Sequence, residues 1–285
     1  MPDRRSASTI RLGQSRKADE MAVPLLVMPG DTATAERHRR VGDAIAMMQS
    51  GSDRPLTLDE LAETASYSRY HFVRTFREIT GTSPGMFQTA LRFARASDLL
   101  LTTTASVTEI CGEVGYSSLG TFSDRFRDLV GVTPTGLREL PHRTAALRTA
   151  ALDRIGLPLG REGCRIQVMV PDIAARMDAV YLGLFHDGVA SGIPVAGTMV
   201  RGAGFVTLAG FPPGRYHVLA AAFPAPIEGL GHLLPGGDVL VGATGRPITV
   251  TPAASPVQRL GFRPLAPTDA PILTALPALV LSRLP

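Results

Sequence analysis

The fold of the first half of the chain is decided by TLDELAETASYSRYHFVRTFREITGTSP at residues 57–84 and by SVTEICGEVGYSSLGTFSDRFRDLVGVTP at residues 106–134. The two stretches are copies of one pattern, with aligned residues first 49 and then 50 positions apart because the second copy has one extra residue in its middle. The aligned pairs are Glu60–Glu109, Leu61–Ile110, Tyr67–Tyr116, Phe72–Phe122, Phe76–Phe126, Arg77–Arg127, Gly81–Gly131 and Pro84–Pro134. Such an internal repeat predicts a structural unit that is used twice.

Each copy has the signals of a helix, a short turn and a second helix. Thr57 and Ser106 each stand three residues before a glutamate, which is the capping-box pattern that begins a helix. Ser68 and Ser118 follow the turn, where a serine side chain can cap the next helix. We therefore predict that these four residues cap helices, and that the N–H groups at the capped ends can also bind phosphate.

Further helices connect and flank the two copies. Gly81 and Gly131 suit left-handed positions at helix C-termini, and Pro84 and Pro134 suit the first turn of a following helix. A helix of roughly 18 residues beginning at Pro84 joins the copies. With one helix at about 36–49 and a short one after Pro134, the sequence predicts an all-α domain of seven helices.

The second helix of each copy has an aromatic side and a mostly polar side. At 100° per residue, Phe72 and Phe76 share one direction, as do Phe122 and Phe126. This side should face the core of the unit and leave the other side free for a partner. The positions that we expect to contact the partner are Arg69, Tyr70, Val73, Arg74 and Arg77 in the first copy and Gly120, Ser123, Asp124 and Arg127 in the second.

A helix with such a free face fits the major groove of DNA, where an arginine can donate two hydrogen bonds to guanine. The plain alternative is that both faces are solvated surfaces of a small helical protein. Two copies of a capped helix, a short turn and a second helix that carries arginine, separated by one rigid helix, are hard to explain by packing alone. The repeat therefore favours double-stranded DNA as the partner.

Residues 38–140 resemble the DNA-binding domain of the AraC/XylS family of transcription regulators. The resemblance rests on VTEICGEVGYSSLGTFSDRFRDLVGVTPTGLREL, which is similar to the family signature, and on LTLDELAETASYSRYHFVRTFREITGTSP, which is similar to its first half. It implies a sequence-specific regulator that places two recognition helices in successive major grooves, about 34 Å apart. Members usually carry this domain at the C-terminus, whereas about 145 residues follow it here. The role of those residues therefore does not carry over from the family.

The resemblance also implies which residues contact bases. The family's positions fall on Tyr70, Val73 and Arg74 in the first recognition helix and on Leu119, Gly120, Thr121 and Asp124 in the second. Asp124 stands where many members have arginine, and Gly120 has no side chain, so we expect weaker reading by the second helix. Ser66 replaces a turn glycine and Cys111 a small alanine, and we expect both to be neutral packing changes.

The composition, 45% hydrophobic and 19% charged, is typical of a globular protein rather than of a membrane-embedded or disordered one. The net charge of +4 is not concentrated in the helical half, because residues 36–141 contain 12 arginines and 13 acidic residues. The longest apolar stretches, around residues 218–227, are broken by proline and shorter than the roughly 20 residues of a membrane span. We expect a cytoplasmic protein in which Cys111 and Cys164 stay reduced.

The second half of the chain is rich in turns, with 16 of 23 prolines and 18 of 29 glycines after residue 155. Branched and alternating runs predict short strands at residues 165–170, 179–185, 195–200, 205–208, 216–221, 239–243, 248–251 and 258–262. Strands at this spacing favour an antiparallel β-sandwich. The stretch GFVTLAGFPPGRYHVLAA, residues 204–221, resembles the strand-turn-strand hairpin of transthyretin-like and CnaB-like sandwiches, in which Tyr216 would pack on the core.

The predicted organisation is therefore multidomain, α plus β. It comprises a flexible segment at 1–34, a double helix-turn-helix domain at 35–141, a linker at 142–163 and a β-sandwich at 164–285.

Two hypotheses for the β domain stay open. In the first, it binds a small-molecule or protein effector and alters DNA binding by the helical domain. In the second, it only forms a homodimer or binds another protein, so that the chain is a constitutive DNA-bound adaptor. His186, Asp187, Arg215 and His217 can form a polar site, although solvated loops and the wet face of a strand explain them more simply.

We expect no catalytic residues and no cofactor or metal, because nucleophile-elbow, zinc-protease, clustered Cys/His and phosphate-loop motifs are all missing. A DNA-repair methyltransferase with a related helix-turn-helix would need a Pro-Cys-His-Arg motif. The sequence Pro141-His142-Arg143 lacks the cysteine.

Overall fold

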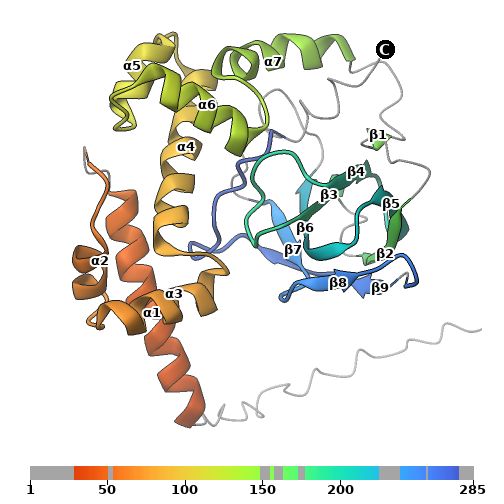
Figure 1. Cartoon of the computed structure of the whole chain (residues 1–285), viewed down its shortest axis with the longest axis horizontal. Helices are drawn as coiled ribbons and strands as arrows, with labels where there is room; N and C mark the ends of the chain where they lie inside the picture. Colours follow the sequence, from red (N-terminus) through yellow and green to blue (C-terminus); the bar gives the residue numbers. More distant parts are fainter. Residues whose placement is uncertain are drawn as a thin grey trace, which may run out of the picture.

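The computed structural model describes residues 29–50, 54–147, 155–156, 163–172, 177–224, 238–254 and 256–275. Its helices lie on one side and its strands on the other (Figure 1). The helices of the described residues are α1 (Pro29–Gln49), α2 (Leu58–Thr64), α3 (Arg69–Thr80), α4 (Pro84–Thr102), α5 (Val107–Glu113), α6 (Leu119–Val130) and α7 (Pro134–Leu147). The predicted seven helices are therefore present in the predicted order.

The predicted caps begin the predicted helices. Thr57 and Ser106 each form a complete capping box, and Ser68 and Ser118 accept hydrogen bonds from the N–H groups three residues on. Two helix bounds differ from expectation. Helix α1 begins at Pro29 rather than near residue 36, so its first residues fall inside the segment predicted to be flexible, and residues 1–28 lie outside the described part. Helix α7 continues past residue 141 to Leu147.

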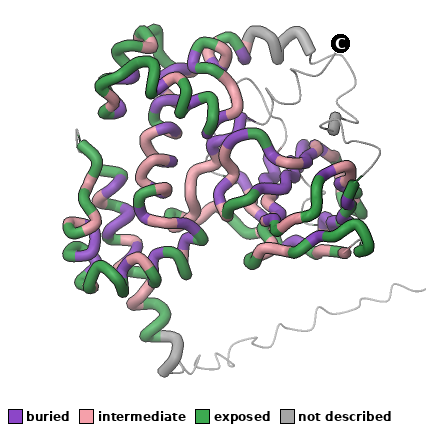
Figure 2. The backbone as a smooth tube through the Cα atoms, in the orientation of Figure 1, coloured by how far each residue is buried: buried purple, intermediate pink, exposed green. Residues whose placement is uncertain are grey.

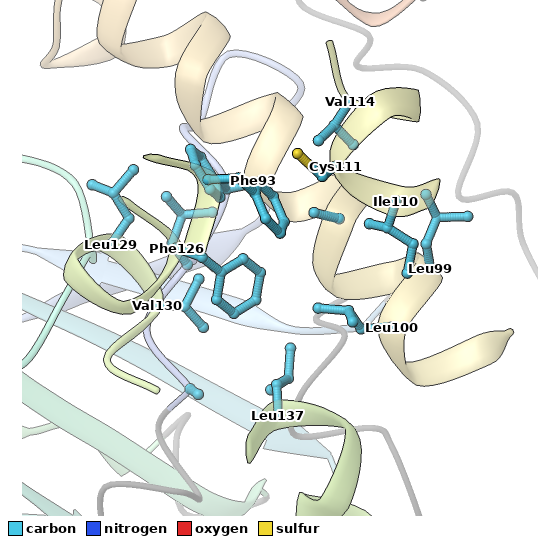
Figure 3. Packing of buried hydrophobic residues seen from close by; sticks show 14 of the residues in the cluster. Phe93, Leu99, Leu100, Ile110, Cys111, Val114, Phe126, Leu129, Val130 and Leu137 are labelled. Carbon is cyan, nitrogen blue, oxygen red and sulfur yellow. The ribbon is translucent and has the colours of Figure 1, made fainter. Parts of the chain in front are cut away.

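Each helix-turn-helix unit has its own core, and α4 contributes to both. Phe72 and Phe76 of α3 pack with Phe87 from the start of α4 in the first core. Phe93, further along α4, packs against Phe126 of α6 in the second core (Figure 3). It also stacks on Phe122 of the same helix. A single helix thus holds the two units at a fixed separation along its length.

The strands form a larger and a smaller sheet. They are β1 (Ile155–Gly156), β2 (Cys164–Val170), β3 (Met177–Phe185), β4 (Ala196–Val200), β5 (Gly204–Phe211), β6 (Gly214–Pro224), β7 (Leu240–Ala243), β8 (Ile248–Val250), β9 (Val257–Arg259) and β10 (Gly261–Pro264). The order is β1-β4-β3-β6-β7-β10 in the larger sheet, with β8 on β6, and β5-β2-β9 in the smaller one. The two sheets share one core. It contains Ile166 and Leu208 from the smaller sheet and Leu182 and Val218 from the larger one.

The strand arrangement corrects two expectations. Strand β9 pairs with β2 in parallel, so the domain is not purely antiparallel. Residues 204–221 do not form a hairpin, because β5 pairs with β2 in the smaller sheet while β6 pairs with β3, β7 and β8. Pro212 and Pro213, which lie between β5 and β6, cannot donate backbone hydrogen bonds, and the connection crosses from one sheet to the other. The transthyretin-like or CnaB-like assignment remains a prediction.

Tyr216 is buried, as predicted, and secures this crossing. Its ring contacts Phe211 at right angles, and its hydroxyl donates to the carbonyl of Pro212 at 2.9 Å. This bond back to the chain four residues upstream is similar to the tyrosine corner of immunoglobulin-type sandwiches.

The last described segment, residues 265–275, returns from the sheet to the helices, and we name it the C-terminal strap. Leu273 and Ala275 belong to the core of the second helix-turn-helix unit, and Ala270 packs against the core of the first. The backbone N–H of Ala275 donates to the carbonyl of Val130 at the end of α6 at 2.9 Å. Most of the strap is buried or half-buried beside α4 (Figure 2). The two predicted domains are therefore packed together by a segment far from the helices in sequence.

Candidate nucleic-acid interface

Helix α3 presents its predicted contact residues to solvent. Ser68 caps its first turn, and Gly81 at φ 75° ends it in the left-handed conformation. Phe72 and Phe76 are fully buried on the inner side. On the outer side Tyr70 is 81% exposed and the side chain of Arg74 is 70% exposed. Arg69 and Arg77 are also exposed, and Val73 is half-buried.

Carboxylates hold two of these arginines on the surface. Arg74 forms an ion pair with Glu78 at 2.9 Å, and Arg37 of α1 bonds the same carboxylate. Hydrogen bonds from Arg74 and then Arg37 lower the pKa of Glu78 below its usual value. Arg69 lies 3.1 Å from Asp59 of α2. Because these pairs are exposed, each stabilises the fold only slightly, and a phosphate or a base edge can compete for the guanidinium groups.

Helix α6 presents fewer arginines than α3 at the predicted contact positions. Leu119 is 43% exposed, and Thr121 and Asp124 are exposed, whereas Ser123 is half-buried. A methyl group added at Gly120 would meet only the hydroxyl of Ser118, at 4.0 Å, so this part of the surface is open. Arg127 lies 3.4 Å from Asp124. The acidic residue therefore reduces the positive potential of the one arginine that we predicted to act on this helix.

An arginine from the preceding helix supports the turn of each unit. Arg40 of α1 donates to the carbonyl of Ser66 at 3.3 Å and lies over the ring of Tyr67. Arg92 of α4 donates to the carbonyls of Val114 and Gly115 at 2.7 Å and lies over Tyr116. The guanidinium group satisfies carbonyls that the turn leaves without helical partners, and it fixes how the two helices of the unit meet.

Ser66 is not the neutral replacement that we expected. Its φ of 55° lies in the left-handed region, and its counterpart Gly115 has φ 77°. A side chain in this conformation is strained, at a cost of about 1–2 kcal/mol. Cys111, the other departure, is buried and its thiol lies 3.4 Å from the carbonyl of Tyr116, consistent with a packing role.

Sequence reasoning missed two exposed side chains on these helices. His71 stacks on Tyr67 with ring centroids 4.5 Å apart. It aligns with Thr121 of the second copy, which is one of the predicted contact positions. Arg125 is exposed on α6. Applying the positions predicted in one copy to the aligned positions of the other would have identified His71. It would not have identified Arg125, because the aligned residue of the first copy is the buried Thr75.

The four polar residues considered as a polar site, although solvated surface explains them more simply, lie where β3 ends beside β6. Phe185 pairs with His217 across these strands, and the ring of His186 lies 5.3 Å from that of Tyr216. Burial lowers the pKa of His217, with Asp187 opposing the shift and Arg215 adding to it. Among the described residues, no three His, Cys, Asp or Glu side chains lie close enough to hold a metal ion. None of the helices in the described residues is long and apolar enough to cross a membrane.

Comparison with known proteins defines the class of this domain. A family model described as a helix-turn-helix domain matches residues 61–140, and curated relatives match the same part of the chain. The chain is 33% identical over 97 residues to the HTH-type transcriptional regulator ArgR of Pseudomonas aeruginosa, covering 34% of this chain and 30% of ArgR. It is 29% identical over 105 residues to the right origin-binding protein of Escherichia coli, covering 37% and 36%.

A solved AraC-type regulator from Chromobacterium violaceum is 30% identical, covers 40% of this chain and 96% of that one, and has a TM-score of 0.35. The chain spans about a third of the length of these curated relatives. Residues 61–140 thus form a helix-turn-helix domain.

Proposed function

We propose that this protein is a sequence-specific DNA-binding transcription regulator, with α3 and α6 as recognition helices in successive major grooves. The observation that carries the proposal is the duplicated unit whose second helix buries its phenylalanines and exposes Tyr70, Arg74 and Arg77. The names of the relatives support it, since they are those of transcription regulators and an origin-binding protein. The capped helix ends at Thr57, Ser68, Ser106 and Ser118 would position backbone N–H groups toward phosphates.

The decisive experiment selects genomic DNA fragments bound by the full chain, sequences them, and titrates the best fragment by fluorescence anisotropy. We expect a recurring sequence and an affinity that falls with added salt, because arginines that neutralise phosphates release counterions. Arg74→Ala should weaken binding to the selected fragment by about 5- to 150-fold, the value of one good base contact.

A matched control is Arg165→Ala, which removes an exposed arginine from β2 in the smaller sheet. It should leave the affinity unchanged within about twofold, because surface charges far from the duplex are screened by salt. Equal losses for both variants, or a selection that yields no shared sequence, would contradict specific recognition through α3.

A further inference from the structure

The larger sheet has one face in the core that it shares with the smaller sheet and a second face toward the helices. Residues of the second face alternate with the core residues along each strand. Tyr181 of β3, Ala221 of β6 and Val241 of β7 stand in register across it. With Phe223 and Ile272 of the strap they form a separate hydrophobic cluster. This face is therefore built to contact apolar groups rather than water.

A cavity of about 490 Å³ lies on this second face, between the sheet and the helices. Its floor is a row of Gly183, Leu219, Ala243 and Gly261. Each residue of the row pairs with the next across the neighbouring strands β3, β6, β7 and β10. A methyl group added at Gly261 would meet nothing within 4 Å, so the space above it is open. The walls come from the sheet, from the β3–β4 loop, from the strap and from Thr80 at the end of α3.

The lining specifies the chemistry of an occupant. Among the described residues that line it, only Arg263 and Asp269 are charged, and Arg263 donates to the Asp269 carboxylate at 2.6 Å, so the two charges satisfy each other. The hydroxyl of Thr80 donates a hydrogen bond to the carbonyl of Phe76 at 2.8 Å. The remaining lining side chains are aliphatic or aromatic. A volume in the range of about 300–1,000 Å³ with such walls suits a small, uncharged, largely apolar molecule.

Two elements that line the cavity also contact both helix-turn-helix units. In the β3–β4 loop, Gly188 is a lining residue that lies against the carbonyl of Gly81 after α3. Four residues on, the N–H of Gly192 donates to the carbonyl of Leu129 in α6 at 2.6 Å. The strap places Ile272 in the cavity wall and the next residue, Leu273, in the core of the second unit. The loop therefore contacts the ends of both proposed recognition helices, and the strap contacts the end of α6 and the core of the first unit.

We propose that this cavity binds a small, uncharged, apolar molecule and that its occupancy changes DNA affinity through the β3–β4 loop and the strap. The proposal rests on the proposed DNA-binding function for its regulatory half, whereas binding to the cavity can be measured without DNA. The proposal places a ligand site on the larger sheet. It makes the β domain an effector domain rather than a module that only forms dimers.

The binding experiment titrates the full chain with N-phenyl-1-naphthylamine, an uncharged aromatic probe whose fluorescence rises in apolar surroundings. We expect saturable binding of one probe per chain. Gly261→Leu and Ala243→Leu each fill the floor of the cavity from a different strand and should weaken probe binding by tenfold or more. Thr207→Leu adds the same side chain at an exposed position on β5 in the smaller sheet and should bind the probe as the natural chain does. Unsaturable binding, or equal binding by all four proteins, would overturn the site.

The coupling experiment measures affinity for the selected DNA fragment with and without saturating probe. We expect a change of about fivefold or more in the natural chain, typical of allosteric coupling, and none in Gly261→Leu. Probe should also alter hydrogen exchange at the amides of Gly192 and Ala275, which contact α6. Saturable probe binding with neither effect would overturn the regulatory half. Loss of DNA binding in every sample, with probe binding and exchange effects intact, would refute the proposed function and leave the site standing.

Discussion

At the scale of single residues, Ser66 carries a cost that its counterpart in the second unit avoids. Both residues occupy the left-handed turn between the helices, but only Gly115 lacks the side chain that makes this conformation unfavourable. The carbonyl of Ser66 is held by Arg40, and its own side chain is exposed. The native fold therefore imposes the conformation through the backbone.

Replacing Ser66 with glycine should stabilise the protein. We expect Ser66→Gly to raise the free energy of unfolding by about 0.5–1 kcal/mol, because relief of strain exceeds the added freedom of the unfolded chain. Urea unfolding followed by circular dichroism at 222 nm measures the change. The reverse exchange, Gly115→Ser, should lower stability by a similar amount. A loss of stability in Ser66→Gly would show that the side chain makes a favourable contact.

The capping box at Glu60 should make stability depend on acid pH. Hydrogen bonds from Arg54, and then from the backbone and side chain of Thr57, lower the pKa of Glu60 from 4.5 to about 2. A carboxylate with a lowered pKa stabilises the fold fully above its unfolded value, and this contribution disappears as the pH falls from about 4.5 toward 2.

Urea midpoints between pH 5 and pH 2 test this dependence. The natural chain should have a higher free energy of unfolding than Glu60→Gln at pH 5, and this difference should disappear as the pH falls to 2. Glutamine serves as the comparison because it keeps the shape of the cap without the charge. Glu63→Gln, on the same helix but outside the capping box, serves as the control. An advantage over Glu60→Gln that stays constant with pH would contradict the role of the Glu60 charge.

At the scale of elements, α3 and α6, the two proposed recognition helices, share a framework and differ in their outer surfaces. Both bury phenylalanines four residues apart and end in left-handed glycines. Helix α3 adds an exposed tyrosine and arginines, whereas α6 carries Asp124 and Gly120 at the predicted contact positions. The first unit is therefore expected to supply most of the sequence discrimination.

Removing the charge of Asp124 should strengthen DNA binding. We expect Asp124→Asn to tighten binding by about two- to tenfold at low salt, because a carboxylate near phosphates is repelled. The gain should shrink as salt screens the charges. Anisotropy titrations at two salt concentrations measure it. Asp172→Asn, an exposed change in the β domain, should have little effect. Weaker binding by Asp124→Asn would instead indicate that this carboxylate accepts a hydrogen bond from a base.

At the scale of the whole molecule, the strap makes the two parts of the chain depend on each other. Leu273 is 4% exposed within the core of the second helix-turn-helix unit, although about 130 residues separate it from the end of that unit. The hydroxyl of Thr274 donates to the carbonyl of Gly192 at 3.0 Å, which ties the strap to the β3–β4 loop. Stability of the second unit should therefore include a contribution from the strap.

Truncating Leu273 tests this dependence. Leu273→Ala should lower the free energy of unfolding by about 2–5 kcal/mol, the usual cost of such a cavity in a core. Guanidinium unfolding followed by helical circular dichroism reports it. Val257→Ala, which shortens an exposed side chain on β9, should cost less than about 0.5 kcal/mol. If the two variants lose equal stability, the strap does not contribute to the helical core.

The sequence by itself determined the features that depend on neighbours along the chain. Capping boxes, left-handed glycines and the spacing of phenylalanines involve residues three to five apart, so the seven helices and the inner and outer sides of α3 followed from local pattern. Most strand positions followed similarly from alternation and turns, but the single strand predicted at residues 258–262 is divided between β9 in the smaller sheet and β10 in the larger one.

Only the tertiary structure decided which strands pair and where the chain returns. The parallel pairing of β9 with β2, the separation of β5 from β6, and the cavity beneath the strap all join residues distant in sequence. Ala275 donates to Val130 across 145 positions, and nothing local to either residue favours that bond over another. Such contacts form because several elements bury apolar surface together, which a pattern within one segment cannot encode.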